Sequence, residues 1–323
     1  RSSDLVGGTE ASEAAVESAL QWFARHQRSD GGWSFDHHGE KCRGQCNHPG
    51  TLVEARIGAT AMGLLPFLGA GHTHQSGAYR EQVQGGLSFL LRSMNAKKGQ
   101  PGDLRERGGT SGTMYSQGLA TIALCEAYGM TQDKALESPA QTALNYLAEA
   151  QFADGGWPNE ATKRGDTSVL SWVLMALKTG GMADLNVSEA SFQGASRFLD
   201  SVQSNGGATY GDQGPERRGR VATATTAIGL LCRMHLDWKR DNEALQRGVQ
   251  ALATKRGPAK DDLYYNYYAT QVLWHYGGSL WEKWNQQMRQ HLIPSQNQSG
   301  HPKGSWSPVG VYPVDKQGGR HYC

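Results

Sequence analysis

The sequence predicts an all-α protein in which an outer ring of helices surrounds an inner ring, the architecture called an α/α toroid. Three observations support this prediction. One helix-loop-helix unit recurs along the 323 residues, its helices alternate between two types, and glycines cluster in the loops between them. A repeat of roughly fifty to sixty residues is typical of folds in which neighbouring units bury a shared core. We therefore expect one domain over residues 1–323.

The two clearest copies of the unit end a helix with Gln and continue into a Gly-Gly-Trp loop. The first runs to Gln27 and Trp33, and the second to Gln151 and Trp157. Glycine permits the left-handed backbone that ends many helices, and the aromatic ring can pack back against the helix end. Polar-faced helices of this type are predicted at 19–27, 86–94, 143–151, 195–203, 248–254 and 285–296.

Helices of the second type lie between these and carry small or apolar residues on nearly every face, as a fully buried helix requires. They are predicted at 57–68, 113–128, 168–177, 222–234 and 264–276. Six hairpins result, with the sixth inner helix truncated because it starts only near His321. An open ring would expose apolar flanks, so we expect the chain to be a fragment of a longer one.

Composition excludes two classes of partner. The formal net charge is +2 and no basic run stands out, whereas a nucleic-acid-binding surface needs clustered Lys and Arg. No apolar run is long enough to span a bilayer. We expect a soluble domain that does not bind nucleic acid, and attachment to a membrane-anchored or exported longer chain stays open.

The segments from Gln27 to Trp33 and from Gln151 to Trp157 resemble the QW repeat of squalene and hopene cyclases and of protein prenyltransferase β subunits. The resemblance extends over essentially the whole chain as a repeat pattern and identifies a divergent member. It implies a central cavity with its chemistry in the loops at one end. It is specific for the fold rather than for the activity.

The acid motif that the resemblance implies is missing. Hopene-type cyclases protonate an alkene with an Asp-x-Asp-Asp motif, and this sequence contains none. Asp166 and Asp262 are the candidate catalytic acids in its place. Each is also placed to be the N-cap of an inner helix, which is the ordinary role of Asp there.

The zinc site that the resemblance implies is incomplete. Prenyltransferases hold zinc with an Asp, a Cys two residues later and a His at a later inner helix. Asp262 and His321 match two of these ligands, whereas Tyr264 stands at the Cys position. Tyrosine is a rare zinc ligand. The alternative is that Asp262 caps the fifth inner helix and His321 begins the sixth.

The loop after the first helix holds the densest set of metal-ligating residue types in the sequence. His37 and His38 are followed by Cys42, Cys46 and His48. Tetrahedral zinc sites accept Cys and His from irregular loops, so Cys42, Cys46 and His48 are a second candidate metal set. A local disulfide or free thiols are the alternatives.

Aromatic residues at the starts of inner helices are candidate binding residues. Tyr264 and Tyr265 begin the fifth inner helix and Tyr115 the second. Ring faces attract cations and bury prenyl chains, although such residues at helical spacing also form ordinary cores.

Three arginines lie near the starts of inner helices. Arg56, Arg220 and Arg320 could bind an anionic group such as a diphosphate at the cavity mouth. They could equally pair with Asp166 and Asp262.

Three classes of function follow, in order of preference. The first is a module that binds an isoprenoid or other apolar ligand, or a protein segment. The second is a terpenoid cyclase or prenyltransferase with a non-standard acid or metal site. The third is a glycan-active enzyme, which would need a pair of carboxylates that the sequence does not single out.

Overall fold

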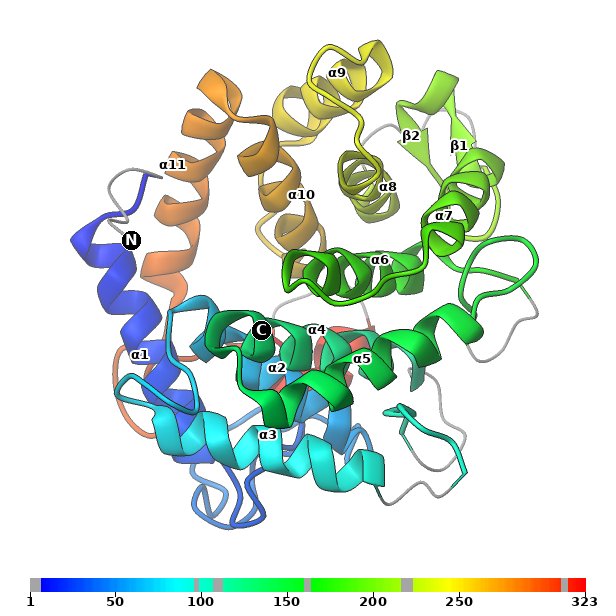
Figure 1. Cartoon of the computed structure of the whole chain (residues 1–323). Helices are drawn as coiled ribbons and strands as arrows, with labels where there is room; N and C mark the ends of the chain where they lie inside the picture. Colours follow the sequence, from blue (N-terminus) through cyan, green and yellow to red (C-terminus); the bar gives the residue numbers. More distant parts are fainter. Residues whose placement is uncertain (1–6, 96–98, 107–112, 160–163, 216–222, 309–312) are drawn as a thin grey trace.

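The computed structural model describes residues 7–95, 99–106, 113–159, 164–215, 223–308 and 313–323, and in this part of the chain helices alternate between two concentric rings (Figure 1). The outer helices are α1 (Glu10–His26), α3 (Arg80–Asn95), α5 (Lys134–Glu149), α7 (Glu189–Val202), α9 (Glu243–Gln250) and α11 (Gly278–Ser295). The inner helices are α2 (Arg56–Gly69), α4 (Thr113–Thr131), α6 (Thr167–Met182), α8 (Ala224–His235), α10 (Leu263–Tyr276) and α12 (Pro313–Tyr322). The predicted α/α toroid of six hairpins is confirmed.

The inner helices form the core because they are buried on most sides. In α6 all but a few residues between Thr167 and Gly180 are buried, whereas α7 buries a single stripe. An amphipathic outer helix covering an apolar inner one is the arrangement that the two sequence patterns predicted. No helix in the described part of the chain combines the length and the apolar character that crossing a bilayer requires.

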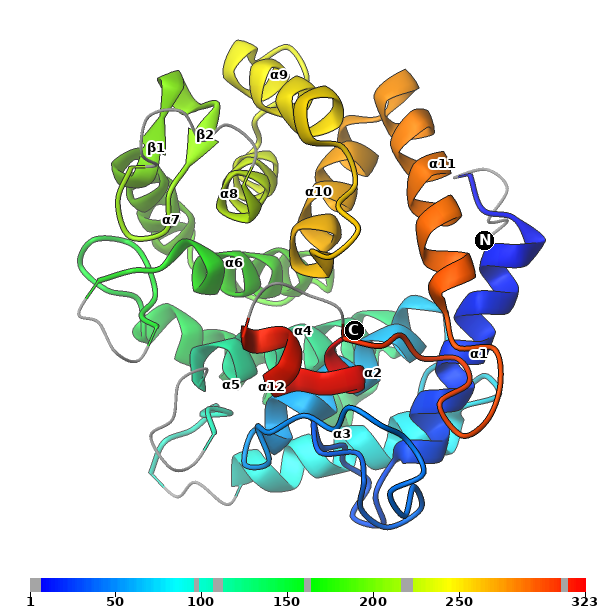
Figure 2. The same ribbon diagram turned by 180° about the vertical axis from the view of Figure 1, so that it is seen from behind.

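The sixth inner helix differs from the others. α12 begins at Pro313, before the expected start near His321, and lies across the ring next to α2 (Figure 2). Gly319 has a φ of 58°, so the helix breaks there. Arg320, His321 and Tyr322 form a separate last turn.

A glutamine at the end of an outer helix ties one repeat to the next at three of the junctions, those after α1, α5 and α11. Gln151 Nε2 donates to Gly155 O in its own loop at 2.8 Å and to a carbonyl of α7 at 3.0 Å. Gln27 Nε2 donates to Gly31 O at 2.7 Å and to a carbonyl of α3 at 2.8 Å. The acceptors in the next outer helices are Ser191 and Gln82. One amide therefore satisfies two carbonyls, which fixes the distance between repeats.

The same bond closes the ring. Gln296, after the last outer helix, donates to Gly304 O at 2.9 Å and to Ala15 O of α1 at 2.8 Å. Arg25 of α1 also donates to Lys303 O at 2.8 Å. The last repeat thus contacts the first repeat through the same glutamine bonds that join Gln151 to its own loop and to α7.

Glycine is required in these loops because two backbones meet there. Gly155 has a φ of 89°, and a Cβ at this position would lie 2.0 Å from Gly194 O of α7. A Cβ at Gly304 would lie 1.9 Å from Ser18 O of α1. Any side chain would push the neighbouring outer helix away.

The tryptophan of each loop packs back on its helix, as predicted. Trp157 Nε1 donates to Leu147 O at 2.7 Å, and Trp33 Nε1 donates to Phe23 O at 2.8 Å. The helix end differs from the prediction, because α1 stops at Gln27 in extended backbone with a φ of −67° rather than at a left-handed glycine. The indole N–H satisfies a carbonyl that a glycine cap would otherwise satisfy.

The fourth loop replaces this pattern with a short hairpin. β1 (Gln203–Ser204) pairs antiparallel with β2 (Thr209–Tyr210) across the 3-10 turn η2 (Asn205–Gly207). Tyr210 takes the place of tryptophan and its hydroxyl accepts from Arg233 Nε at 3.1 Å.

Replacing Gln151 by Ala should lower the free energy of unfolding by about 1–3 kcal/mol, because two partly buried carbonyls lose their donor. Urea unfolding followed by circular dichroism measures this change. Gln193→Ala, at an exposed position of α7, is the matched control and should change stability by less than about 0.5 kcal/mol. Equal effects of the two substitutions would contradict the role of Gln151.

Candidate metal centre and ring interior

Two histidines and two cysteines from the first and the last hairpins of the chain lie together in one group. His26 lies in the last turn of α1, Cys42 and Cys46 lie in the loop that follows, and His301 lies in the loop between α11 and α12. Their ligand atoms all lie within 4.8 Å of one another. Such a group could hold a metal ion.

The distances within the group suit tetrahedral coordination. Cys46 Sγ lies 3.4 Å from His26 Nε2 and 3.2 Å from His301 Nδ1, and Cys42 Sγ lies 3.8 Å from His301 Nδ1. With Zn–S bonds of about 2.3 Å and Zn–N bonds of about 2.0–2.1 Å, a tetrahedron places sulfur and nitrogen about 3.6 Å apart.

Tight turns bring the two thiols to one side of the loop. Cys42 N donates to Gly39 O at 3.1 Å, and Gln45 N donates to Cys42 O at 3.0 Å. Between the cysteines, Arg43 and Gly44 have φ values of 48° and 71°. This left-handed pair reverses the chain, so Cys42 and Cys46 face the same point.

Hydrogen bonding orients the imidazole of His26. Its Nδ1 lies 2.6 Å from Trp22 O, and a carbonyl can only accept. Nδ1 therefore carries the proton, and Nε2 presents its lone pair to the two thiols. A backbone carbonyl on the second ring nitrogen is the usual support of a metal-binding histidine.

Burial disfavours the charged forms of His26 and Cys46. Burial, together with the nearby His37, His301 and Arg25, lowers the pKa of His26 to about 3. Burial raises the pKa of the Cys46 thiol to about 11. Metal binding would thus release thiol protons and depend on pH. Cys42 and Cys46 are both free thiols, so the local disulfide that the spacing allowed is not formed.

The histidines of the group differ from the sequence prediction. His48, predicted beside the cysteines, is exposed, and its carbonyl accepts from Arg320 N at 3.2 Å. His26 and His301 occupy the ligand positions instead. His301 is 255 residues away from Cys46, and the only signal for it would have been the expectation that the last loop meets the first.

Arg320 holds this region together rather than lining the ring mouth. Its Nε donates to Asn47 O at 2.9 Å, and its two terminal nitrogens donate to Ser305 Oγ and Ser307 Oγ, each at 3.1 Å. The side chain is buried. Arg320 therefore joins the loop of Cys46 to the loop of His301.

Arg56 is engaged by the first Gly-Gly-Trp loop. Arg56 pairs with Asp30 Oδ2 at 2.8 Å and donates to Trp33 O at 2.7 Å, so it stabilises the first Gly-Gly-Trp loop. It pairs with neither Asp166 nor Asp262. Arg220 lies outside the described residues.

Asp166 and Asp262 both cap inner helices, as the alternative role predicted. Asp166 accepts from Ser168 N at 2.9 Å and Val169 N at 3.2 Å. Asp262 accepts from Tyr265 N at 2.9 Å and pairs with Arg256 at 2.5 Å. Both are only 2% exposed, and the contacts of both are those of structural caps.

The two prenyltransferase-like ligands have other partners: Asp262 pairs with Arg256, and neither Asp262 nor His321 belongs to the group of four metal-capable side chains in the described residues. His321 Nε2 lies 2.7 Å from Ala59 O, so that nitrogen is a donor.

Tyrosines fill the ring interior near the starts of the inner helices. Tyr115 hydrogen-bonds Ser168 at 2.6 Å, and Tyr268 hydrogen-bonds Ser171 at 2.9 Å. Burial raises the pKa of Tyr264 well above its usual value.

Tyr265 points the other way from these tyrosines. Its ring lies 3.8 Å below the Arg256 guanidinium and 6.2 Å from the Trp284 ring of α11. It therefore belongs to the packing between the rings rather than to the interior.

Comparison with solved structures supports the fold alone. An α-amylase from Clostridium perfringens superposes with a TM-score of 0.62 at 12% identity, covering 96% of this chain and 97% of that one. The type II terpene cyclase MstE from Scytonema gives 0.60 at 14% identity, covering 92% and 82%. An inactive α-1,6-mannanase variant of Salegentibacter sp. HEL1_6 bound to α-1,6-mannotetrose gives 0.58 at 12% identity, covering 95% and 96%. No family model and no curated protein matches the sequence.

Buried His321 should make the protein less stable in acid. Burial lowers the pKa of His321 from 6.5 to about 4, so below pH 6.5 the unfolded chain binds a proton that the folded chain does not. The contribution of His321 to the free energy of unfolding is fully present above pH 6.5. It is lost as the pH falls towards 4, by up to about 3 kcal/mol. His321→Gln keeps a donor towards Ala59 O. Its free energy of unfolding, measured by urea unfolding with a chelator present, should fall less steeply between pH 6.5 and pH 4 than that of the wild type. Identical pH profiles would contradict this assignment.

Proposed function

We propose that the chain is a zinc-binding α/α toroid in which one zinc ion ties the first hairpin to the last. The observation that supports it is the converging group of His26, Cys42, Cys46 and His301. Four protein ligands leave no open position for water or substrate, which is typical of structural zinc.

The choice of zinc follows from the chemistry of the donors. Thiolate sulfur and imidazole nitrogen in tetrahedral arrangement suit zinc, whereas magnesium and calcium require oxygen ligands. His26 is already oriented by Trp22 O at 2.6 Å, so little reorganisation is needed. Burial keeps the His26 imidazole and the Cys46 thiol neutral without metal, so these two groups do not repel a neighbouring charge.

The ion would add to the bonds that already close the ring. Gln296 bonds α1, Arg25 bonds the loop after α11, and Arg320 joins the loops of Cys46 and His301. All of these contacts are hydrogen bonds. Metal binding free energy becomes folding free energy where the unfolded chain has no site. Zinc would therefore stabilise the junction between the first and last repeats most.

The purified protein should contain one zinc per chain by mass spectrometry of the metal, and a chelator should lower its Tm. Cys46→Ser and His301→Ala should lose the metal. Cobalt substitution should give the thiolate charge-transfer band and the visible absorption of a tetrahedral site.

Two matched variants decide which residues hold the metal. His48→Ala, in the same loop, and Cys125→Ser, a buried cysteine of α4, should keep full zinc content. Zinc lost in His48→Ala but kept in His301→Ala would refute the proposed ligand set.

We further propose that the ring is a binding module for an apolar ligand, as a divergent member of the squalene-cyclase and prenyltransferase repeat family. Trp172 of α6 stacks on Tyr267 of α10 at 5.6 Å, although α8 lies between these helices in the ring. Tyr267 and Trp274 are 45% and 46% exposed on an inner helix. Burial nevertheless raises the pKa of Tyr267 to about 12, a combination expected in the wall of a hollow.

The enzymatic alternatives have less support. A cyclase would use Asp166 or Asp262 as its acid, and both carboxylates are occupied as helix caps. The mannanase variant that shares the fold is inactive with two aspartates replaced. Asp261 and Asp262 are adjacent in this chain, but Asp262 is bound by Arg256.

Geranylgeraniol should quench the tryptophan fluorescence of the zinc-loaded protein, and α-1,6-mannotetraose should not. Tyr267→Ala with Trp274→Ala should weaken binding at least tenfold, since stacking area is lost. Met182→Ala, at a position 86% exposed at the end of α6, is the control and should bind normally.

Other outcomes would select an alternative. Cyclised product from geranylgeranyl substrates would indicate the cyclase, and hydrolysis of mannotetraose would indicate the glycosidase. Unchanged binding in the double variant would refute the aromatic site.

A further inference from the structure

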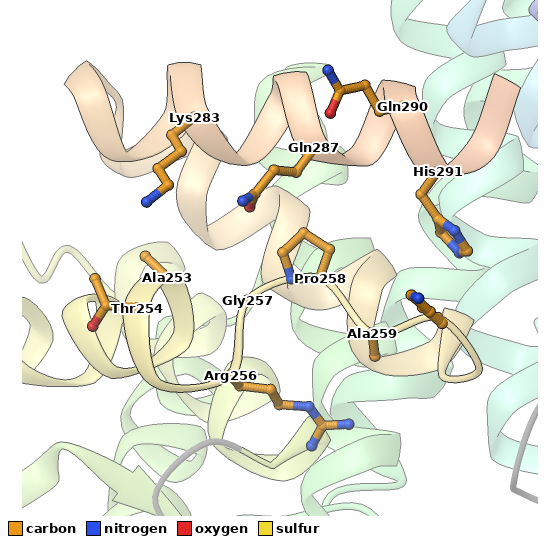
Figure 3. Close-up of a pocket in the computed structure, with 11 residues that line it drawn as sticks. Ala253, Thr254, Arg256, Gly257, Pro258, Ala259, Lys283, Gln287, Gln290 and His291 are labelled. Carbon is orange, nitrogen blue, oxygen red and sulfur yellow. The ribbon is translucent and has the colours of Figure 1, made fainter.

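A hollow of about 550 Å³ lies outside the ring, between the fifth hairpin and α11 (Figure 3). Its walls are the π-helical turn η3 (Ala251–Arg256), the following segment to Lys260, and one face of α11. This volume is within the range of small-ligand sites. None of the metal ligands or ring-interior tyrosines described above contributes to it.

The backbone explains why the hollow exists. α9 ends after eight residues and continues as the π turn η3, a rare conformation often found at functional sites. Gly257, with a φ of 66°, and Pro258 then turn the chain towards α10. The fifth outer helix therefore stops short, while α11 continues past it.

The lining is basic and contains no carboxylate. Eleven residues line the hollow, among them Arg256, Lys260, Lys283 and His291, and none is Asp or Glu. In the described part of the chain, Lys260 and Lys283 form no ion pair. Like charges gathered in a concavity attract anions more strongly than the same charges on a flat surface.

One cation is fixed in place. Arg256 pairs with Asp262 at 2.5 Å and lies over the Tyr265 ring, so its guanidinium helps to shape the wall. Lys283 and Gln287 extend from α11 towards η3 (Figure 3). Because Arg256 is paired, Lys260 and Lys283 are the lysines in the lining that can pair with an anionic ligand.

The neutral lining residues indicate what else the ligand carries. Gln287, Gln290 and Thr254 offer amides and a hydroxyl, which bond hydroxyl groups. Ala253 and Pro258 offer small apolar patches. No Phe, Tyr or Trp side chain lines the hollow, and the His291 imidazole is its one aromatic ring, so a nucleotide base would find little area to stack on.

We propose that this basic hollow binds an anionic oligosaccharide, with its carboxylate or sulfate groups on Lys260 and Lys283 and its hydroxyl groups on Thr254, Gln287 and Gln290. The hollow is open to solvent rather than enclosed, as a chain-like ligand requires. This site is separate from the ring interior and from the proposed zinc.

Calorimetry on the zinc-loaded protein tests the proposal with four probes. A heparin-derived tetrasaccharide supplies sulfates and a galacturonic acid tetrasaccharide supplies carboxylates. Tripolyphosphate supplies charge without hydroxyl groups, and mannotetraose supplies hydroxyl groups without charge. At least one anionic sugar should bind at least tenfold more tightly than tripolyphosphate and mannotetraose, and its affinity should fall with added salt.

Variants locate the site. Lys260→Gln with Lys283→Gln should weaken binding of the anionic sugar at least tenfold with unchanged Tm. Lys134→Gln with Lys239→Gln removes the same charge from two exposed positions elsewhere and should bind as the wild type. Absence of anionic-sugar binding, equal loss in both double variants, or tripolyphosphate binding as tight as the sugars would overturn the proposal.

Discussion

One amide group sets the spacing of the outer ring. A glutamine at the end of an outer helix donates to its own loop and to the next outer helix, as Gln151 does with Gly155 and Ser191. Because both acceptors are backbone carbonyls, the bond fixes two backbones relative to each other. It works only where glycine lets the loop approach the next helix, and only where tryptophan closes the helix behind it.

Where the ring closes, between the last and the first repeats, the glutamine bond is accompanied by a second set of contacts, the group of histidines and cysteines. Gln296 repeats the bond with α1, so the last interface copies those that follow α1 and α5. The loop between α1 and α2 is longer than the other loops, however, and the converging side chains of His26, Cys46 and His301 have no counterpart elsewhere in the described repeats. A metal ion there would link segments far apart in sequence, where closing a loop costs the most conformational entropy.

Function in this fold depends on side chains that the repeats do not need. Asp166 and Asp262 precede inner helices and accept hydrogen bonds from their first backbone N–H groups, so capping alone accounts for an Asp at each position. The basic hollow beside Lys283 and the aromatic wall at Tyr267 are different, because no helix cap or loop bond requires them. Tyr267 and Trp274 are large aromatic side chains that stay about half exposed on an inner helix, which packing alone does not explain.

The sequence by itself determined the helices, their alternation and the two rings, because these follow from periodic burial and from the local Gln-Gly-Gly-Trp pattern. It also indicated the caps at Asp166 and Asp262. Only the tertiary structure decided that His301 and His26, rather than His48, face Cys42 and Cys46, and that Arg320 joins two loops. The contacts of His301 and Arg320 with the first loop join residues more than 250 positions apart, and no local propensity specifies which side chains meet when a ring closes.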